Sequence, residues 1–172
     1  MEMTGLDPEV DRVLEIAVVV TDSELNILDE SLDMVIHQPS AVLNSMNSWC
    51  KKQHGKSGLT KKCLESKISL SEAKREVLKM VRKYCEKKTG LLCGNSIHAD
   101  RKFLKKYFPR VDSYLNYRMI DVTSVKELAK RWYAKEAKVF LSHKEEDVSH
   151  RALDDIKYSI NELKFYRETI FK

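Results

Sequence analysis

The sequence has 172 residues, of which 42% are hydrophobic and 33% charged, and its net charge is +5. This composition is ordinary for one globular domain with a mildly basic surface, which is compatible with a polyanionic partner. No apolar run approaches the roughly 18 residues needed to cross a membrane, so we expect no membrane partner. The four cysteines show no C-x-x-C spacing, which argues against a zinc knuckle and favours reduced thiols and an intracellular location.

The start of the chain predicts an antiparallel meander. The run 13–20 is apolar and rich in β-branched residues, which suits a strand buried on both faces. A turn at 21–23 separates it from a second strand at 27–36. The segment before Gly5 has the pattern of the end of an earlier strand, followed by a turn.

Helical patterns follow this meander. From Pro39 onwards apolar residues recur at helical spacing, and this spacing alone would place Trp49 in the core. We expect a loop over 54–58. Ser69 and Glu72 then fit a capping box, which predicts the start of a longer helix. The apolar stripe of that helix would consist of Ala73, Val77, Met80, Val81 and Tyr84.

The second half of the chain alternates strands and helices. A short buried strand at 91–93 leads into a helix that stops near Pro109, and a strand at 119–122 leads into another helix. We expect a charged loop over 134–149 and a final helix from about 150 to 170. Strands first, then alternating helices and strands, predict a single α/β domain over the whole chain, with a mixed central sheet flanked by helices.

Acidic residues stand at the ends of these elements. Glu2 ends the opening strand, Asp100 lies near the start of a helix, and Asp154 and Asp155 lie near the start of the last one. Singly, each has an ordinary explanation as a cap or a dipole partner. Because a helix separates neighbouring residues by about 100°, Asp154 and Asp155 cannot face one site equally. Asp155 lies nearer the apolar side, where a carboxylate needs a cation or a donor. That side would be formed by Leu153, Ile156, Ile160 and Leu163.

Three carboxylates that converge from separate elements would repel one another without a cation. Oxygen ligands suit Mg²⁺ or Mn²⁺, and two such ions about 4 Å apart promote phosphodiester hydrolysis. His150 has a side chain that titrates near neutral pH and suits removal of a proton from water. A lone histidine before a helix is, however, more often a surface residue.

Five stretches resemble the oligoribonucleases, which belong to the DEDDh group of 3′-to-5′ exonucleases. They are "EMTGLDPEVDRVLEIA", "WCKKQHGKSGLT", "GNSIHADRKFLKKYFP", "YRMIDVTSVKELAKRW" and "HRALDDIKYSINELKFYR". They cover essentially the whole chain in the family's order. The second stretch is more similar to the eukaryotic branch of the family, which includes mitochondrial members. The resemblance therefore implies a cytoplasmic or mitochondrial location. The resemblance also implies a ribonuclease H-like fold and hydrolysis of very short RNAs, dinucleotides especially, to 5′-mononucleotides.

The resemblance further assigns roles to residues. Glu2, Asp100 and Asp155 would bind two divalent cations, Mg²⁺ or Mn²⁺, and His150 would be the general base. Asp154 would be a neighbour and not a ligand. The bases would be wedged or stacked by Leu6 and Trp49. The 5′-phosphate would be enclosed by Ser96, His54, Tyr117 and Arg118. Part of this cap would come from the second subunit of a homodimer.

The opening departs from the family's pattern, in which an acidic, an apolar and an acidic residue follow one another so that both acids share a strand face. Glu2 would be the second acid and Met1 the apolar residue, so the first aspartate would precede Met1. We therefore expect that the N-terminal strand is truncated here, either because upstream residues are omitted or because this is a short form with a crippled site. The missing aspartate leaves a non-catalytic module that binds short nucleotides as one alternative. A related DNA exonuclease of the same group is the other alternative.

Overall fold

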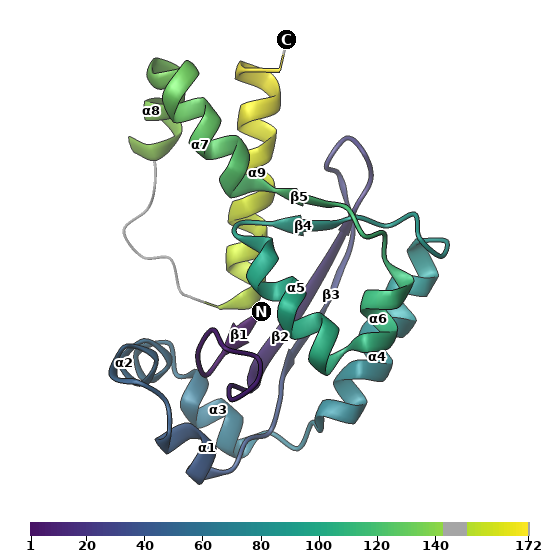
Figure 1. Ribbon diagram of the computed structural model, residues 1–172, viewed down its shortest axis with the longest axis vertical. Helices are drawn as coiled ribbons and strands as arrows, with labels where there is room; N and C mark the ends of the chain where they lie inside the picture. The colour runs from purple at the N-terminus through teal and green to yellow at the C-terminus, as the bar shows by residue number, and fades with distance from the viewer. Residues whose placement is uncertain (143–150, 172) are drawn as a thin grey trace.

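The computed structural model describes residues 1–142 and 151–171. The chain begins with an antiparallel three-stranded sheet in the order β1-β2-β3 (Figure 1). Its strands are β1 (Glu2–Met3), β2 (Val13–Thr21) and β3 (Ile27–Val35). The predicted meander is therefore confirmed.

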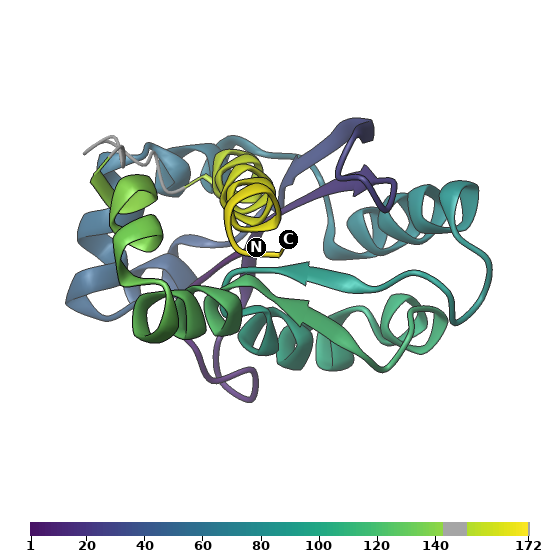
Figure 2. The ribbon, with the colours of Figure 1, turned by 90° about the horizontal axis from the view of Figure 1, so that it is seen from above.

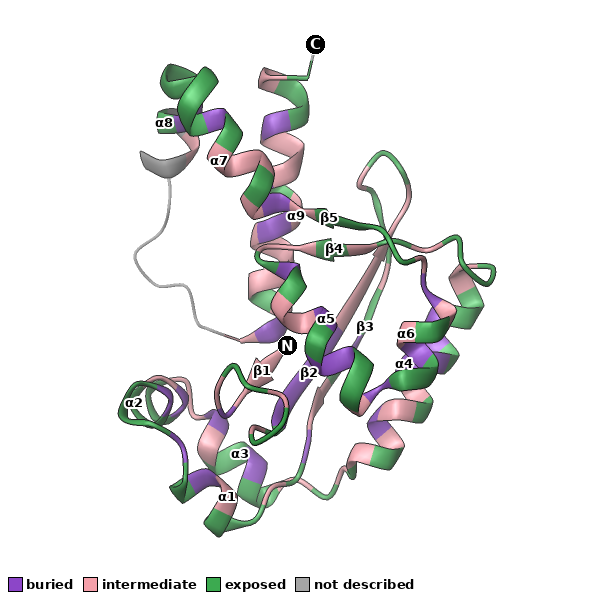
Figure 3. Cartoon of the chain, viewed as in Figure 1, coloured by how far each residue is buried: buried purple, intermediate pink, exposed green. Residues whose placement is uncertain are grey.

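The central strand β2 carries the core of this sheet. Its first five residues are buried and its last four half-buried, as the purple and pink halves of the strand show in Figure 3. Val13 and Ile16 join the main hydrophobic core. Leu14 packs into a second cluster with helical residues. A strand buried on both faces is what its nearly continuous apolar sequence predicts.

Four helices follow the meander. They are α1 (Ser40–Asn44), α2 (Ser48–Lys56), α3 (Leu59–Glu65) and α4 (Leu70–Tyr84). The predicted start of α4 at Ser69 is confirmed, because the Ser69 hydroxyl accepts a hydrogen bond from the Glu72 N–H at 3.1 Å. The predicted loop over 54–58 is wrong in its first half. Asn47 caps α2, the helix continues through Gly55, and the chain turns only at Gly58, whose φ is +72°.

A second, parallel sheet pairs β4 (Leu92–Gly94) with β5 (Met119–Asp121). Between them the chain forms α5 (Ile97–Tyr107) and α6 (Pro109–Tyr114). Seen from above, α9 lies on one side of this sheet and α5 and α6 lie on the other (Figure 2). The predicted strand at 91–93 is present, but it is not buried, since Leu91 and Cys93 are exposed.

The last three helices are α7 (Val122–Trp132), α8 (Ala134–Ser142) and α9 (Ala152–Thr169). The predicted charged loop over 134–149 is wrong as far as residue 142, and its remainder lies outside the described residues. A helix forms because Ala137 is buried against Ala129 and Tyr166. The Phe140 ring also contacts aromatic rings of α9.

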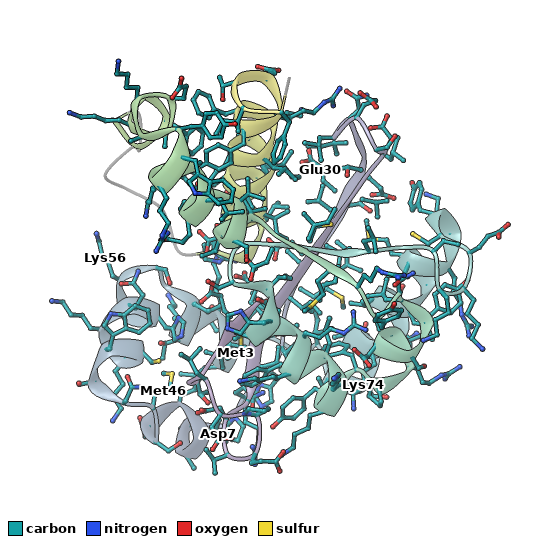
Figure 4. All side chains as sticks on the ribbon, turned by 45° about the horizontal axis from the view of Figure 1, so that its top comes forward. Met3, Asp7, Glu30, Met46, Lys56 and Lys74 are labelled. Carbon is teal, nitrogen blue, oxygen red and sulfur yellow. The ribbon has the colours of Figure 1, made fainter. Side chains whose placement is uncertain are left out.

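The predicted α/β class, with antiparallel and parallel strands flanked by helices, is confirmed and is consistent with a ribonuclease H-like fold. Within the described ranges, the two kinds of strand form separate hydrogen-bonded sheets. The side chains fill the space between sheets and helices, with Met3 near the centre (Figure 4). In the described part of the chain, we find no helix with the length and apolar character needed to span a membrane.

Candidate active site

Glu2 lies at the start of β1, opposite Glu15 on β2, and is half-buried. Burial, and then the negative charges of Asp155, Glu15 and Asp100, raise the pKa of its carboxyl to about 7, although the Met1 amino group opposes the shift. That amino group is 3.2 Å from Asp100 Oδ1. Removal of the carboxylate from water is thus the main reason that its charged form is disfavoured.

Asp100 and Asp155 each lie in the first turn of a helix, α5 and α9 respectively. The positive end of the helix dipole favours an acidic side chain there. Burial alone would lower the pKa of the Met1 amino group, but Asp100, Glu2 and Asp155 together raise it. Carboxylates from three separate elements are therefore all near enough to the Met1 amino group to affect its pKa.

Carboxylate oxygens are the donors that Mg²⁺ and Mn²⁺ prefer. The chemistry of these side chains therefore fits a divalent cation. They are not gathered into a finished metal centre: within 1–142 and 151–171, no group of three or more His, Cys, Asp or Glu side chains is close enough to hold an ion.

Glu15, which is fully buried in β2, binds the residues at the start of α9. Its Oε1 accepts a hydrogen bond from Arg151 Nε at 2.8 Å, and its Oε2 accepts one from the Ala152 N–H at 2.9 Å. His150 lies outside the described residues. One turn into the helix Asp155 is half-buried whereas Asp154 is exposed, as the sequence predicted from their different faces.

Leu6 is 75% exposed on the loop between β1 and β2. Asp11 holds this loop: its Oδ1 accepts from the Thr4 hydroxyl at 2.8 Å and its Oδ2 from the Asp7 N–H at 3.0 Å. Trp49 on α2 is 63% exposed, so the interpretation of this residue as core is wrong. Both side chains are free of the core, as a role in contacting bases requires.

The four residues expected around a 5′-phosphate are not gathered in one chain. The His54 ring is buried under β1, with Nε2 2.9 Å from the Met3 carbonyl oxygen and Nδ1 3.9 Å from Glu2 Oε2. Ser96 is exposed just after the end of β4, whereas Tyr117 and Arg118 are exposed just before the start of β5.

Because β4 and β5 are parallel, these two positions lie at opposite ends of the strand pair. Three residues of strand at about 3.3 Å each separate them by roughly 10 Å. The Arg118 guanidinium instead lies over the ring of Tyr117, 4.6 Å from its centre. The structure therefore does not bring Tyr117 and Arg118 onto the Ser96 of the same chain.

Two features of the site escaped prediction from the sequence. Glu15 could have been noticed as the one acidic residue inside an apolar strand. The second feature is a buried polar network at Asn95, between α7 and α9. Its members lie far apart in the sequence, and no local pattern marks them.

Comparison with known proteins identifies the relatives of this fold and site. Residues 1–163 match the family RNase_T, described as Exonuclease. The chain is 52% identical over all 172 residues to "Oligoribonuclease, mitochondrial" of Bos taurus, covering 71% of that relative. It is 48% identical over 172 residues to "Probable oligoribonuclease" of Dictyostelium discoideum, and 48% identical to "Oligoribonuclease" of Marinobacter nauticus, covering 88% and 93% of those relatives. Exonucleases of this kind generally depend on divalent metal ions.

Proposed function

Since this chain belongs to the exonuclease family RNase_T and resembles oligoribonucleases along its whole length, we propose that it is a 3′-to-5′ exoribonuclease of very short RNAs. Dinucleotides would be its preferred substrates and 5′-mononucleotides its products. The observation that carries the proposal is the similarity to oligoribonucleases, at 52%, 48% and 48% identity over all 172 residues. Glu2, Asp100 and Asp155 would supply the oxygen ligands of the cations that phosphodiester hydrolysis uses.

Each side chain has a task in this proposal. Glu2, Asp100 and Asp155 would hold two ions, Mg²⁺ or Mn²⁺. The bound ions would supply an activated water and charge stabilisation at the leaving oxygen. His150 would accept the proton of the attacking water. The exposed Leu6 and Trp49 would wedge and stack the two bases, a contact that tolerates any sequence.

A homodimer would complete the substrate site. Ser96 would bind the 5′-phosphate together with Tyr117 and Arg118 of the partner subunit, which agrees with their separation within one chain. The surface that would meet a second copy includes exposed apolar residues of β5 and α7. They are Met119, Ile120, Leu128 and Trp132. His54 would join the cap only after its ring leaves the Met3 carbonyl oxygen.

Subunit mixing tests the shared cap. Ser96→Ala and Tyr117→Ala would each impair both sites of a homodimer. In a heterodimer of the two variants, one site would carry both substitutions and the other neither. In a randomly exchanged 1:1 mixture, about a quarter of all sites should therefore carry neither substitution and be active. No recovery after verified subunit exchange would show that the cap is not shared.

Cleavage of a 5′-labelled diribonucleotide in Mg²⁺ and in Mn²⁺ tests the function, with the corresponding deoxydinucleotide beside it. Asp155→Asn should lower kcat/KM by about 100-fold or more, and the exposed Asp154→Asn is the matched control, expected within about threefold of wild type. Binding without cleavage would support the nucleotide-binding module instead. Preferential cleavage of the deoxydinucleotide would support a DNA exonuclease. We further propose an intracellular location, cytoplasmic or mitochondrial, in line with the name of the Bos taurus relative.

A further inference from the structure

The positive charge of this chain is concentrated on α2 and α3. These two helices carry five lysines and one glutamate, which is a formal charge of +4 out of the +5 of the whole sequence. The sequence has no acidic residue over 34–64, although 33% of all its residues are charged. Basic residues that are gathered on one part of a fold, and not balanced by acids, give that part a positive potential.

The outer side of α2 carries an exposed stripe of one aromatic ring and two cations. Cys50 and His54, four residues apart, form the buried side of this helix. Trp49, Lys52 and Lys56 follow one another at intervals of three and four residues, so they share another face, and all three are exposed. Figure 4 shows the Lys56 side chain pointing away from the rest of the molecule.

Few acidic side chains neutralise the lysines of these two helices. In the part of the chain that the structure describes, Lys51 and Lys52 form no ion pair. On α3, Lys61 Nζ lies 3.7 Å from Glu65 Oε1, and the two side chains are 79% and 63% exposed. Water and salt screen such a pair, so its cation stays available to a polyanion.

The inner side of α2 adjoins the candidate active site. His54 Nε2 is 2.9 Å from the Met3 carbonyl oxygen of β1, and His54 Nδ1 is 3.9 Å from Glu2 Oε2. The outer stripe is therefore about one helix diameter, roughly 10–12 Å, from that strand. A polyanion bound along the stripe would be kept close to the acidic site while remaining outside it.

A single-stranded RNA fits this surface better than an anionic membrane does. Proteins hold single strands without reading their sequence by stacking bases on aromatic rings and by placing cations along the backbone. A helix that lies on a membrane needs a broad apolar face. Trp49 is the one large apolar side chain that α2 exposes, so the helix lacks such a face.

We propose that the exposed faces of α2 and α3 are a docking surface for the phosphate backbone of single-stranded RNA that is longer than a dinucleotide. Lys52 and Lys56 bind successive parts of the backbone, and the lysines of α3 extend the surface beyond α2. The inference rests on the proposed function, from which it takes RNA as the partner. The docked RNA lies outside the catalytic site, because the stripe is on the outer side of α2.

Fluorescence anisotropy of a labelled adenine RNA of about ten nucleotides tests the docking surface, with a chelator present so that the RNA is not cleaved. Neutralisation of two or three phosphates should raise the Kd of the wild type roughly tenfold between about 50 and 200 mM salt. Lys52→Gln combined with Lys56→Gln should weaken binding about tenfold at the lower salt concentration and flatten the salt dependence. Lys52→Arg combined with Lys56→Arg should retain both.

The matched control removes the same charge from the other side of the molecule. Lys87, just after α4, and Arg110, in α6, are both exposed, and Figure 1 shows these helices on the opposite side from α2. Lys87→Gln combined with Arg110→Gln should bind the RNA within about twofold of wild type. An equal loss in this control would show that only the total charge matters, and it would overturn the inference.

Two further outcomes decide the inference separately from the function on which it rests. If the Lys52 and Lys56 glutamine pair binds the RNA as tightly as wild type, the docking surface is wrong, whatever the rate of dinucleotide cleavage. If the wild type binds vesicles that contain phosphatidylserine more tightly than it binds the RNA, the partner is a membrane and the inference is overturned. If the wild type does not cleave a diribonucleotide but binds the RNA through these lysines, the proposed function fails and the docking surface stands.

Discussion

Replacement of Glu15 tests how the start of α9 is held. The carboxylate accepts two hydrogen bonds from the Arg151 guanidinium and one from the Ala152 N–H, and it is fully buried. Removal of one partner of a buried ion pair costs about 3–5 kcal/mol. Because the Arg151 side chain is 18% exposed, water can compensate for part of this loss. We therefore expect Glu15→Ala to lower the free energy of unfolding by about 2–4 kcal/mol.

Urea unfolding measures this loss directly. With a dependence on urea of about 2 kcal/mol per M, the midpoint should fall by about 1–2 M. Glu30→Gln is the matched control, since Glu30 also pairs with a residue of α9, Lys157, at 2.9 Å. Both of those side chains are exposed, so the control should change stability by less than about 1 kcal/mol.

A double-mutant cycle identifies the cause. Arg151→Met alone should be destabilising, because it leaves the buried Glu15 carboxylate without its cation. Glu15→Leu combined with Arg151→Met should cost less than the sum of the two single changes. Additive losses, or a Glu15→Ala variant within about 0.5 kcal/mol of wild type, would refute the assignment of this pair as the anchor of α9.

Three further predictions concern the loop, a thiol and the acidic site. A Cβ on Gly5 would lie 2.4 Å from Asp11 Oδ2, so Gly5→Ala should displace the loop that carries Leu6. This change should raise KM for the dinucleotide more than it lowers kcat. An unchanged KM would contradict the prediction. Burial raises the pKa of the Cys63 thiol to about 12, so the folded chain keeps this proton longer than the unfolded chain. The contribution of this neutral buried thiol to the free energy of unfolding is fully present below the ordinary thiol pKa and is lost as pH rises to about 12. The free energy of unfolding of Cys63→Ala should therefore fall less steeply with pH in this range than that of the wild type. Equal slopes for the two proteins would disprove the assignment. A polypeptide extended upstream by an aspartate next to Met1 should cleave the dinucleotide faster in Mg²⁺ than the 172-residue polypeptide. The extension adds a carboxylate and removes the amino group beside Asp100. Equal rates would contradict the predicted pair of acids on β1.

The elements that were predicted correctly have strong local signals. The nearly continuous apolar run of β2 can be buried only on both faces of a strand, and it is. Ser69 and Glu72 act within one turn of a helix, so no distant residue is needed to start α4. The expectation that Glu2, Asp100 and Asp155 share one metal site rests on the resemblance to a family, because no local pattern links residues so far apart in the sequence.

The errors occur where tertiary contacts overrule local preference. Gly55 was expected to break a helix, but the Asn47 cap and the buried Cys50 keep α2 intact through it. The charged composition after residue 134 suggested a loop, yet Ala137 finds a buried position and a helix forms. In both places one or two packed residues outweigh the preferences of their neighbours.

The last helix shows why the polar network was missed. Its apolar residues were expected to face the core, but residues such as Ile156 and Leu163 are only half-buried. The buried positions of α9 are Ala152, Ser159, Glu162 and Tyr166. Hydrophobic periodicity finds a face only when apolar side chains cover it, and here three of the four buried positions carry hydrogen-bonding groups. Asn95 and Lys126 of α7 bond to Ser159 and Glu162, and Glu162 in turn accepts from the Tyr166 hydroxyl. On this face of α9 the hydrophobic pattern of the sequence does not match the residues that are buried. Such mismatches are expected near functional sites.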